Sequence, residues 1–177
     1  MKIKIIVCFL VFDLICALPT FGQLKDVQGW REAKWGMTED EILKAFKGEA
    51  VRLDKIEEWD QLNLYASIGI NNYDINGNKY GVYFAMDKTT KNLKMVQIYL
   101  LDTTSGIVRN RFRDLEQLLT EKYGAPSFKD ASDKILNKIV VSWNIPSTII
   151  ELNYSNITAR NEYLLLNYSM PKGKDKI

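Results

Sequence analysis

Three stretches of the chain alternate between apolar and polar residues with the period of two that a half-buried strand shows: 62–70, 80–86 and 93–100. The dipeptide Asn76-Gly77 stands between the first two stretches, and Asn-Gly is typical of tight hairpin turns. The pattern therefore predicts an antiparallel meander, preceded by a weak strand near residues 51–53.

Two other stretches have the period of an amphipathic helix. In the first, Thr38 and Glu41 have the spacing of a capping box, which predicts a short helix that buries apolar residues within 42–46. The second ends at Gly124, a residue type that favours helix C-termini. Its apolar stripe is longer and consists of Val108, Phe112, Leu115, Leu118 and Leu119.

The remaining segments complete the predicted fold. A polar loop is expected over 127–138, and three further strands over 139–144, 148–154 and 163–168. The sequence therefore predicts an α+β fold, an antiparallel sheet of about six to seven strands with two helices on one face. The predicted order of elements is α-βββ-α-βββ.

The two ends of the chain differ in character from this domain. Residues 1–22 combine a positively charged start, an apolar stretch and small residues before Gln23, which is the layout of a cleaved signal peptide. An uncleaved N-terminal anchor is the alternative. The predicted single domain spans 23–170, and 171–177 form a flexible polar tail. We therefore expect a periplasmic or secreted protein without a membrane span after cleavage.

Composition then limits the function. The 24 Lys and Arg residues against 22 Asp and Glu leave a net charge of +2, which gives no basic footprint for nucleic acid. The chain has no histidine, the commonest general base and metal ligand. Cys8 and Cys16 both lie in the predicted signal peptide, and Asp13 and Ile15 do not fit a lipoprotein signal. We expect a protein that is not an enzyme and needs no metal or cofactor.

Two acidic segments were the candidates for chemistry. Glu57-Glu58-Trp59-Asp60 combines paired carboxylates with an aromatic ring, as glycosidases do. Residues 74–78 carry alternating oxygen donors, as a calcium loop does. Adjacent strand residues point to opposite faces, however, and Lys79 stands where a calcium loop needs glycine. A polar turn and a hairpin are the favoured interpretations, so no catalytic or metal-binding residue is assigned.

The segment Trp35-Gly36-Met37-Thr38, directly before the first predicted helix, resembles an opening found in many small exported bacterial proteins. The Lys-Tyr-Gly-Ala-Pro run ending at Pro126 and the strand around Trp143 are similar to segments that accompany it. Such proteins resemble the β-lactamase-inhibitor-protein-like fold, which is loosely shared with SmpA/BamE-type lipoproteins. The resemblance implies a periplasmic or secreted interaction module. The missing lipoprotein cysteine argues against membrane anchoring and a barrel-assembly role.

Aromatic residues supply the candidate binding site. If the more apolar side of each meander strand is the core, Tyr65, Tyr83 and Tyr99 lie on the opposite side, and Trp143 can point either way. Tyrosines on an exposed sheet favour protein binding, although strand propensity alone also explains them. The leading hypothesis is a module that binds another envelope or extracellular protein. The alternative is a carrier of a small apolar or lipid ligand held between sheet and helices.

Overall fold

The computed structural model describes residues 26–104, 106–133, 137–158, 161–171 and 173. The predicted signal peptide, both cysteines and most of the predicted tail lie outside these residues. Among the described residues, neither helix combines the length and apolar character needed to cross a membrane.

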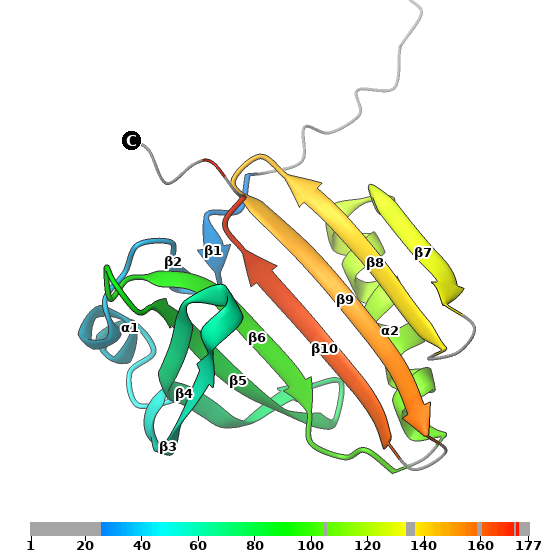
Figure 1. Ribbon diagram of the computed structural model, residues 1–177, viewed down its shortest axis with the longest axis horizontal. Helices are drawn as coiled ribbons and strands as arrows, with labels where there is room; N and C mark the ends of the chain where they lie inside the picture. Colours follow the sequence, from blue (N-terminus) through cyan, green and yellow to red (C-terminus); the bar gives the residue numbers. More distant parts are fainter. Residues whose placement is uncertain (1–25, 105, 134–136, 159–160, 172, 174–177) are drawn as a thin grey trace, which may run out of the picture.

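The described chain forms a two-stranded hairpin, an eight-stranded antiparallel sheet and two α-helices (Figure 1). In chain order the elements are β1 (Gly29–Trp30), β2 (Ala33–Lys34), α1 (Glu39–Ala45), β3 (Val51–Trp59), η1 (Asp60–Leu62), β4 (Leu64–Ile75), β5 (Asn78–Asp87), β6 (Leu93–Leu100), α2 (Ile107–Tyr123), β7 (Phe128–Asp133), β8 (Lys138–Ile145), β9 (Thr148–Thr158) and β10 (Asn161–Ser169). The strand order in the large sheet is β3-β4-β5-β6-β10-β9-β8-β7, so two four-stranded meanders meet where β6 pairs with β10.

The predicted sheet of six to seven strands and the order α-βββ-α-βββ are wrong. The structure adds the β1–β2 hairpin, a full strand β3 and the edge strand β7. β7 lies within the expected loop 127–138 and reads Phe-Lys-Asp-Ala-Ser-Asp, which has no apolar side. β3 is exposed along most of its length and does not alternate regularly. Both are edge strands, so hydrogen bonding to one neighbour defines them more than burial does.

Both helices begin and end close to where the sequence predicts. α1 has Thr38 as its N-cap, and the Glu41 carboxylate accepts hydrogen bonds from the Thr38 N–H and hydroxyl at 2.8 and 3.0 Å. α2 buries the predicted stripe residues Val108, Phe112, Leu115 and Leu119. The Asn76-Gly77 hairpin is also confirmed, since β4 ends and β5 begins on either side of it. These features depend on local sequence, which explains why the sequence alone predicts them.

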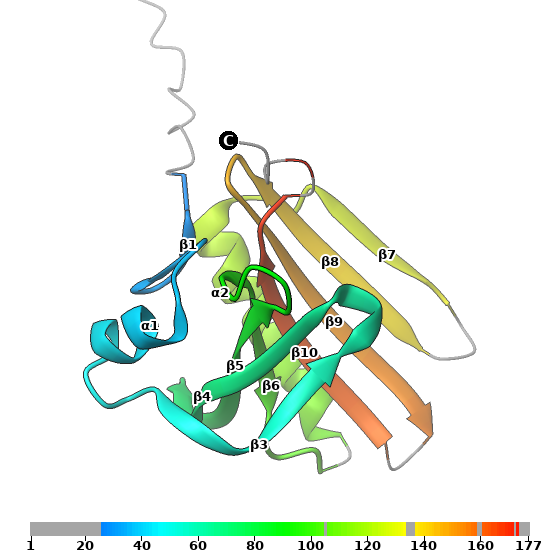
Figure 2. The same cartoon turned by 60° about the vertical axis from the view of Figure 1, so that its left-hand side comes forward.

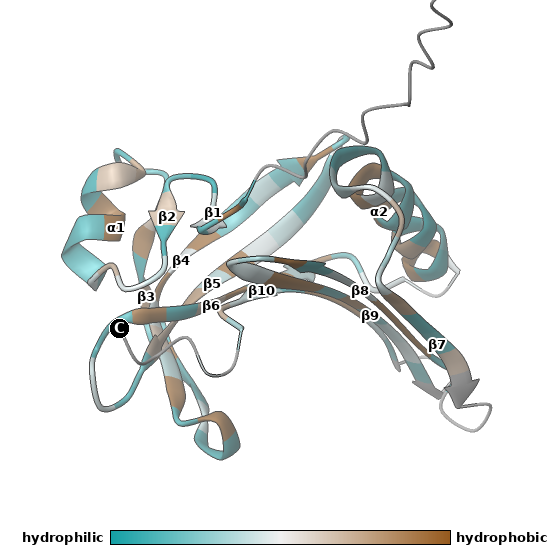
Figure 3. Cartoon of the chain, turned by 90° about the horizontal axis from the view of Figure 1, so that it is seen from above, coloured by the Kyte–Doolittle hydropathy of each residue, from teal (hydrophilic) through white to brown (hydrophobic). Residues whose placement is uncertain are grey.

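α1, the β1–β2 hairpin and α2 lie on the same side of the large sheet (Figure 3), which we call the helix face. One apolar core joins them to the sheet and includes Ile42 and Phe46 from the α1 region and Phe112 from α2. Across the strands, the helix face is formed by Ile70, Val82, Ile98, Leu166, Leu152 and Val141, which are paired in register. In Figure 2, α1 and β1 lie at the left of the view, and the β3–β4 hairpin is in the foreground.

The opposite side of the sheet, which we call the open face, carries neither of the two described α-helices (Figure 3). Successive side chains of a strand point to opposite sides, so the residues next to those of the helix face point to the open face. In register across the strands these are Gly69, Tyr83, Gln97, Asn167, Glu151, Ser142 and Phe128. The open face therefore changes from aromatic to polar as it crosses from β5 to β8.

Candidate functional site

Three aromatic side chains gather on the open face at the β3–β6 end of the sheet. Tyr83 of β5 and Tyr99 of β6 stack with their ring centroids 4.8 Å apart and their planes at 24°. Trp59, the last residue of β3, packs its edge against Tyr83 with centroids 5.9 Å apart. We call Trp59, Tyr83 and Tyr99 the aromatic cluster. Both tyrosines are only half-buried, so they offer ring surface to a ligand or partner.

The register of β5 and β6 explains how the two tyrosines come together. Tyr99 pairs directly with Gly81, whereas Tyr83 pairs with Gln97, so the tyrosines are diagonal neighbours. A Cβ atom at Gly81 would lie 2.2 Å from Cζ of Tyr99, which shows that the Tyr99 ring lies over the bare backbone of Gly81. Gly81 thus provides the space in which Tyr99 meets Tyr83.

The aromatic cluster sits on a small apolar core of its own. Leu64, Ala85 and Met95 are buried on the open side of the sheet, and Trp59 packs against them. Burial raises the pKa of Tyr83, and its hydrogen bond with Tyr99 raises that pKa further. The Tyr83 hydroxyl therefore stays protonated at neutral pH. The site combines a fixed apolar surface with uncharged hydrogen-bonding tips.

Beyond the cluster, the open face is polar and hydrogen bonded within itself. Gln97 Nε2 donates to Asn167 Oδ1 at 3.2 Å, and Asn153 Nδ2 donates to Glu151 Oε1 at 2.7 Å. Tyr163 of β10 is 46% exposed on the same side of the sheet. The open face thus has an aromatic part and an adjoining amide part, which is a composition suited to protein contact.

Tyr65 does not belong to this surface, contrary to the prediction. The pairing of β4 with β5 shifts by one residue between Tyr65 and Gly69, so β4 contains a bulge there. Tyr65 consequently lies opposite Met86 on the helix face, where its hydroxyl donates to Glu39 of α1 at 2.9 Å. Burial and the hydrogen bond to Glu39 raise the pKa of Tyr65 to about 12. Its role is to attach α1 to the sheet.

Trp143 is also excluded from the surface. Its side chain is 1% exposed in the main core, and its Nε1 donates to the Gly124 carbonyl at the end of α2 at 2.9 Å. Trp143 pairs with Ile150 on the helix face of β8 and β9. The assignment of Trp143 to the binding face is therefore corrected: it fixes the C-terminus of α2 to the sheet.

Trp59 is the member of the cluster that the sequence analysis missed, because it stands in an acidic run. The carboxylates around it have structural partners, since Lys88 Nζ bonds both Glu58 and Asp60. The Lys88 ammonium lowers the pKa of Asp60. In the structure, Trp59 pairs with Leu64 of β4, and its ring reaches Tyr83 on the next strand. Among the described residues, no group of three or more His, Cys, Asp and Glu side chains could hold a metal ion.

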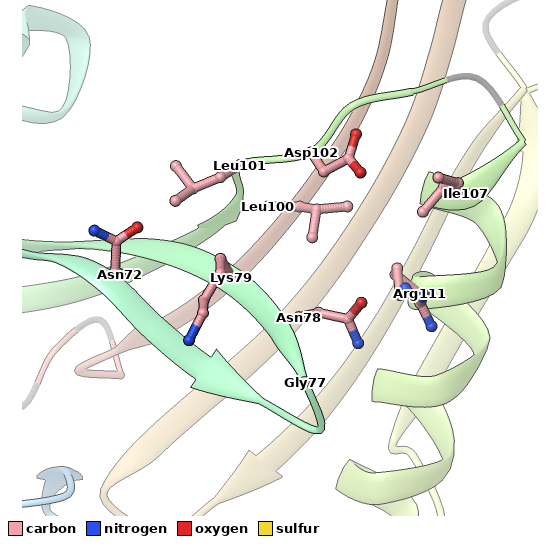
Figure 4. A pocket seen from close by; sticks show the side chains of 9 residues that line it. All are labelled: Asn72, Gly77, Asn78, Lys79, Leu100, Leu101, Asp102, Ile107 and Arg111. Carbon is pink, nitrogen blue, oxygen red and sulfur yellow. The ribbon is translucent and has the colours of Figure 1, made fainter.

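A hollow lies between the β4–β5 hairpin and the start of α2 (Figure 4). Its volume is about 450 Å³, and its floor includes Leu100. The cations at its edge already have partners: Lys79 pairs with Asp74 at 2.9 Å and Arg111 with Asp114 at 3.1 Å. The hollow therefore carries no excess positive charge with which to select an anion.

The sequence matches no family model and no curated protein. A crystal structure of a DUF4309 family protein (YjgB) from Bacillus subtilis subsp. subtilis str. 168 is similar in part. Its TM-score is 0.34 at 13% identity, over 76% of this chain and 78% of that chain. A likeness this weak supports no conclusion about the present protein.

Proposed function

We propose that the protein is an exported interaction module that binds another envelope or extracellular protein through its open face. The observation that carries this proposal is the stacked pair Tyr83–Tyr99, with Trp59 beside it, on a side of the sheet that neither described α-helix covers. The predicted signal peptide supports a location in the periplasm or the medium.

The aromatic cluster has the properties of a protein-binding hot spot. Tyrosine and tryptophan are enriched in hot spots because they bury a large area at a small cost in side-chain entropy. Here that cost is lower still, since Tyr99 is already held over Gly81 and stacked on Tyr83 in the free protein. The neighbouring amides Gln97 and Asn167 provide hydrogen-bonding groups for the rim of such an interface.

Site-directed photocrosslinking tests the proposal in the mature chain, residues 23–177. A photoreactive phenylalanine analogue at Tyr163, on the open face, is expected to form one discrete adduct with a protein from the source envelope. The double substitution Tyr83→Ser/Tyr99→Ser should reduce the adduct by at least about tenfold, because two hot-spot rings are lost.

Tyr65→Ser is the matched control, since it removes a half-buried tyrosine from the other side of the sheet. It should leave the adduct at its original level in folded protein. Equal losses in the control and the double variant, or adducts formed only from a probe on α1 such as Lys44, would show that the open face is not the interface.

A further inference from the structure

A second hollow lies on the helix face, between β1 and the C-terminal half of α2. Its volume is about 250 Å³. The walls are mainly apolar and come from segments far apart in the sequence, and they include Val27, Trp30, Ile75, Ile98, Leu115, Leu118, Leu119 and Leu166. We call this hollow the helix-face groove.

The groove follows from the way in which the helix face is covered. α2 packs over β9 and β10, whereas α1 lies over the other half of the sheet and β1 contacts β10 (Figure 3). Ile98 of β6 and Leu166 of β10 line the groove between β1 and α2. Leu118 and Ile75 are only half-buried beside it. An apolar ligand would complete their burial.

Positive charge stands at the rim of this groove. Arg31 is neutralised, because its guanidinium bonds Glu49 at 2.7 Å and also contacts Glu32. Lys122 also lines the groove, and its ammonium lies 5.0 Å from the Tyr123 ring. Among the described residues, no ion pair includes Lys122. Its charge is therefore available to an anionic group at the groove.

The interior of the groove is uncharged, which sets the direction in which a ligand would enter. Tyr168 and Tyr123 both line it with uncharged side chains. Burial raises the pKa of Tyr168 well above its ordinary value, so its hydroxyl stays neutral. A charged head group inside would lose its hydration without a counter-charge. The apolar part of a ligand must lie inside and its head group at Lys122.

We propose that the helix-face groove binds a single-chain amphiphile with an apolar tail and an anionic head group, such as a carboxylate, paired with Lys122. The volume is just below the range of about 300–1,000 Å³ typical of small-molecule sites, which favours one tail of medium length over a two-chain lipid. This site is separate from the open face and does not depend on the proposed protein binding.

Calorimetric titration of the mature protein with hexanoate, octanoate and decanoate, each as a monomer in solution, tests the tail. Each added methylene that becomes buried should raise the affinity about fourfold. Decanol, which has the same tail without the charge, should bind more weakly than decanoate. Leu118→Trp is expected to fill the groove and to abolish binding, with circular dichroism as the check that the variant is folded.

Lys122→Ala should weaken decanoate binding about twofold to fivefold and remove the difference between decanoate and decanol. Lys55→Ala is the matched control, an exposed lysine on β3 outside the groove, and should bind like the unmodified protein. An affinity independent of chain length, or equal losses in the two lysine variants, would overturn the proposal. The Tyr83→Ser/Tyr99→Ser variant should retain decanoate binding, which separates this result from the test of the open face.

Discussion

Gly69 and Gly81 lie on neighbouring strands of the open face, and alanine at each is expected to have a different effect. At Gly69 a Cβ atom would lie 2.4 Å from the Val82 carbonyl oxygen, and real contacts stay beyond 3.0 Å. β4 and β5 must therefore separate locally. At Gly81 the clash is with the ring of Tyr99, which can rotate away without moving any backbone.

The expected magnitudes follow from these contacts. Overpacking against backbone costs about 1–3 kcal/mol, and replacing glycine by alanine returns about 0.4–1 kcal/mol through the unfolded state. Gly69→Ala should therefore lower the free energy of unfolding by about 1–2 kcal/mol, or the Tm by about 2–8 °C. Gly81→Ala loses a ring stack worth about 0.5–1.5 kcal/mol. It regains about 0.4–1 kcal/mol through the unfolded state, so its free energy of unfolding should change by less than about 1 kcal/mol.

Urea denaturation of the two variants and the unmodified protein measures these differences. Near-ultraviolet circular dichroism, which reports on the packing of tyrosine rings, should change more in Gly81→Ala than in Gly69→Ala. Gly81→Ala should also weaken the open-face crosslink, because Tyr99 no longer stacks on Tyr83. A Gly81→Ala variant destabilised as much as Gly69→Ala would show that Tyr99 cannot move and would refute this reasoning.

Three further changes test the structure around the site. Trp143→Ala should lower the free energy of unfolding by about 3–5 kcal/mol in urea, because it opens a cavity in the core. Thr38→Ala should cost about 1 kcal/mol by the same measurement, since the start of α1 loses its N-cap side chain. Burial alone would raise the pKa of Glu39, but hydrogen bonds from Ser67 and Tyr65 outweigh it and hold that pKa below 4.5. The stability that Glu39 provides should therefore be present above pH 4.5 and be lost as the pH falls below it, and thermal melts of Glu39→Gln should show a smaller loss on acidification.

The sequence predicts the parts of the fold that depend on neighbouring residues. The start of α1, the stripe of α2 and the Asn76-Gly77 hairpin each combine a strong local preference with a clear period. The edge strands β3 and β7 lack such a period, because their outer edge has no neighbour and their side chains are largely exposed. The predicted strand count was therefore too low.

In the candidate site, the same limit on prediction from sequence applies to Tyr65. Tyr83 and Tyr99 fall on the open face because β5 and β6 alternate regularly around them. Tyr65 has the same apparent pattern, but the bulge in β4 adds one residue and reverses the side to which it points. No feature of residues 62–70 marks that extra residue, since the bulge is set by the pairing with β5. The side of the sheet to which Trp143 points likewise cannot be predicted until the position of α2 is known.

The central position of β10 has a consequence for when this protein can fold. Residues 165–169 pair with 95–99 of β6 on one side and with 149–153 of β9 on the other, so the last strand of the chain joins the two halves of the sheet. A chain synthesised up to residue 160 has all the other strands but cannot complete its core. Pairing over such a long sequence separation is slow, so we expect the joining of β6 to β10 to be a late step in folding.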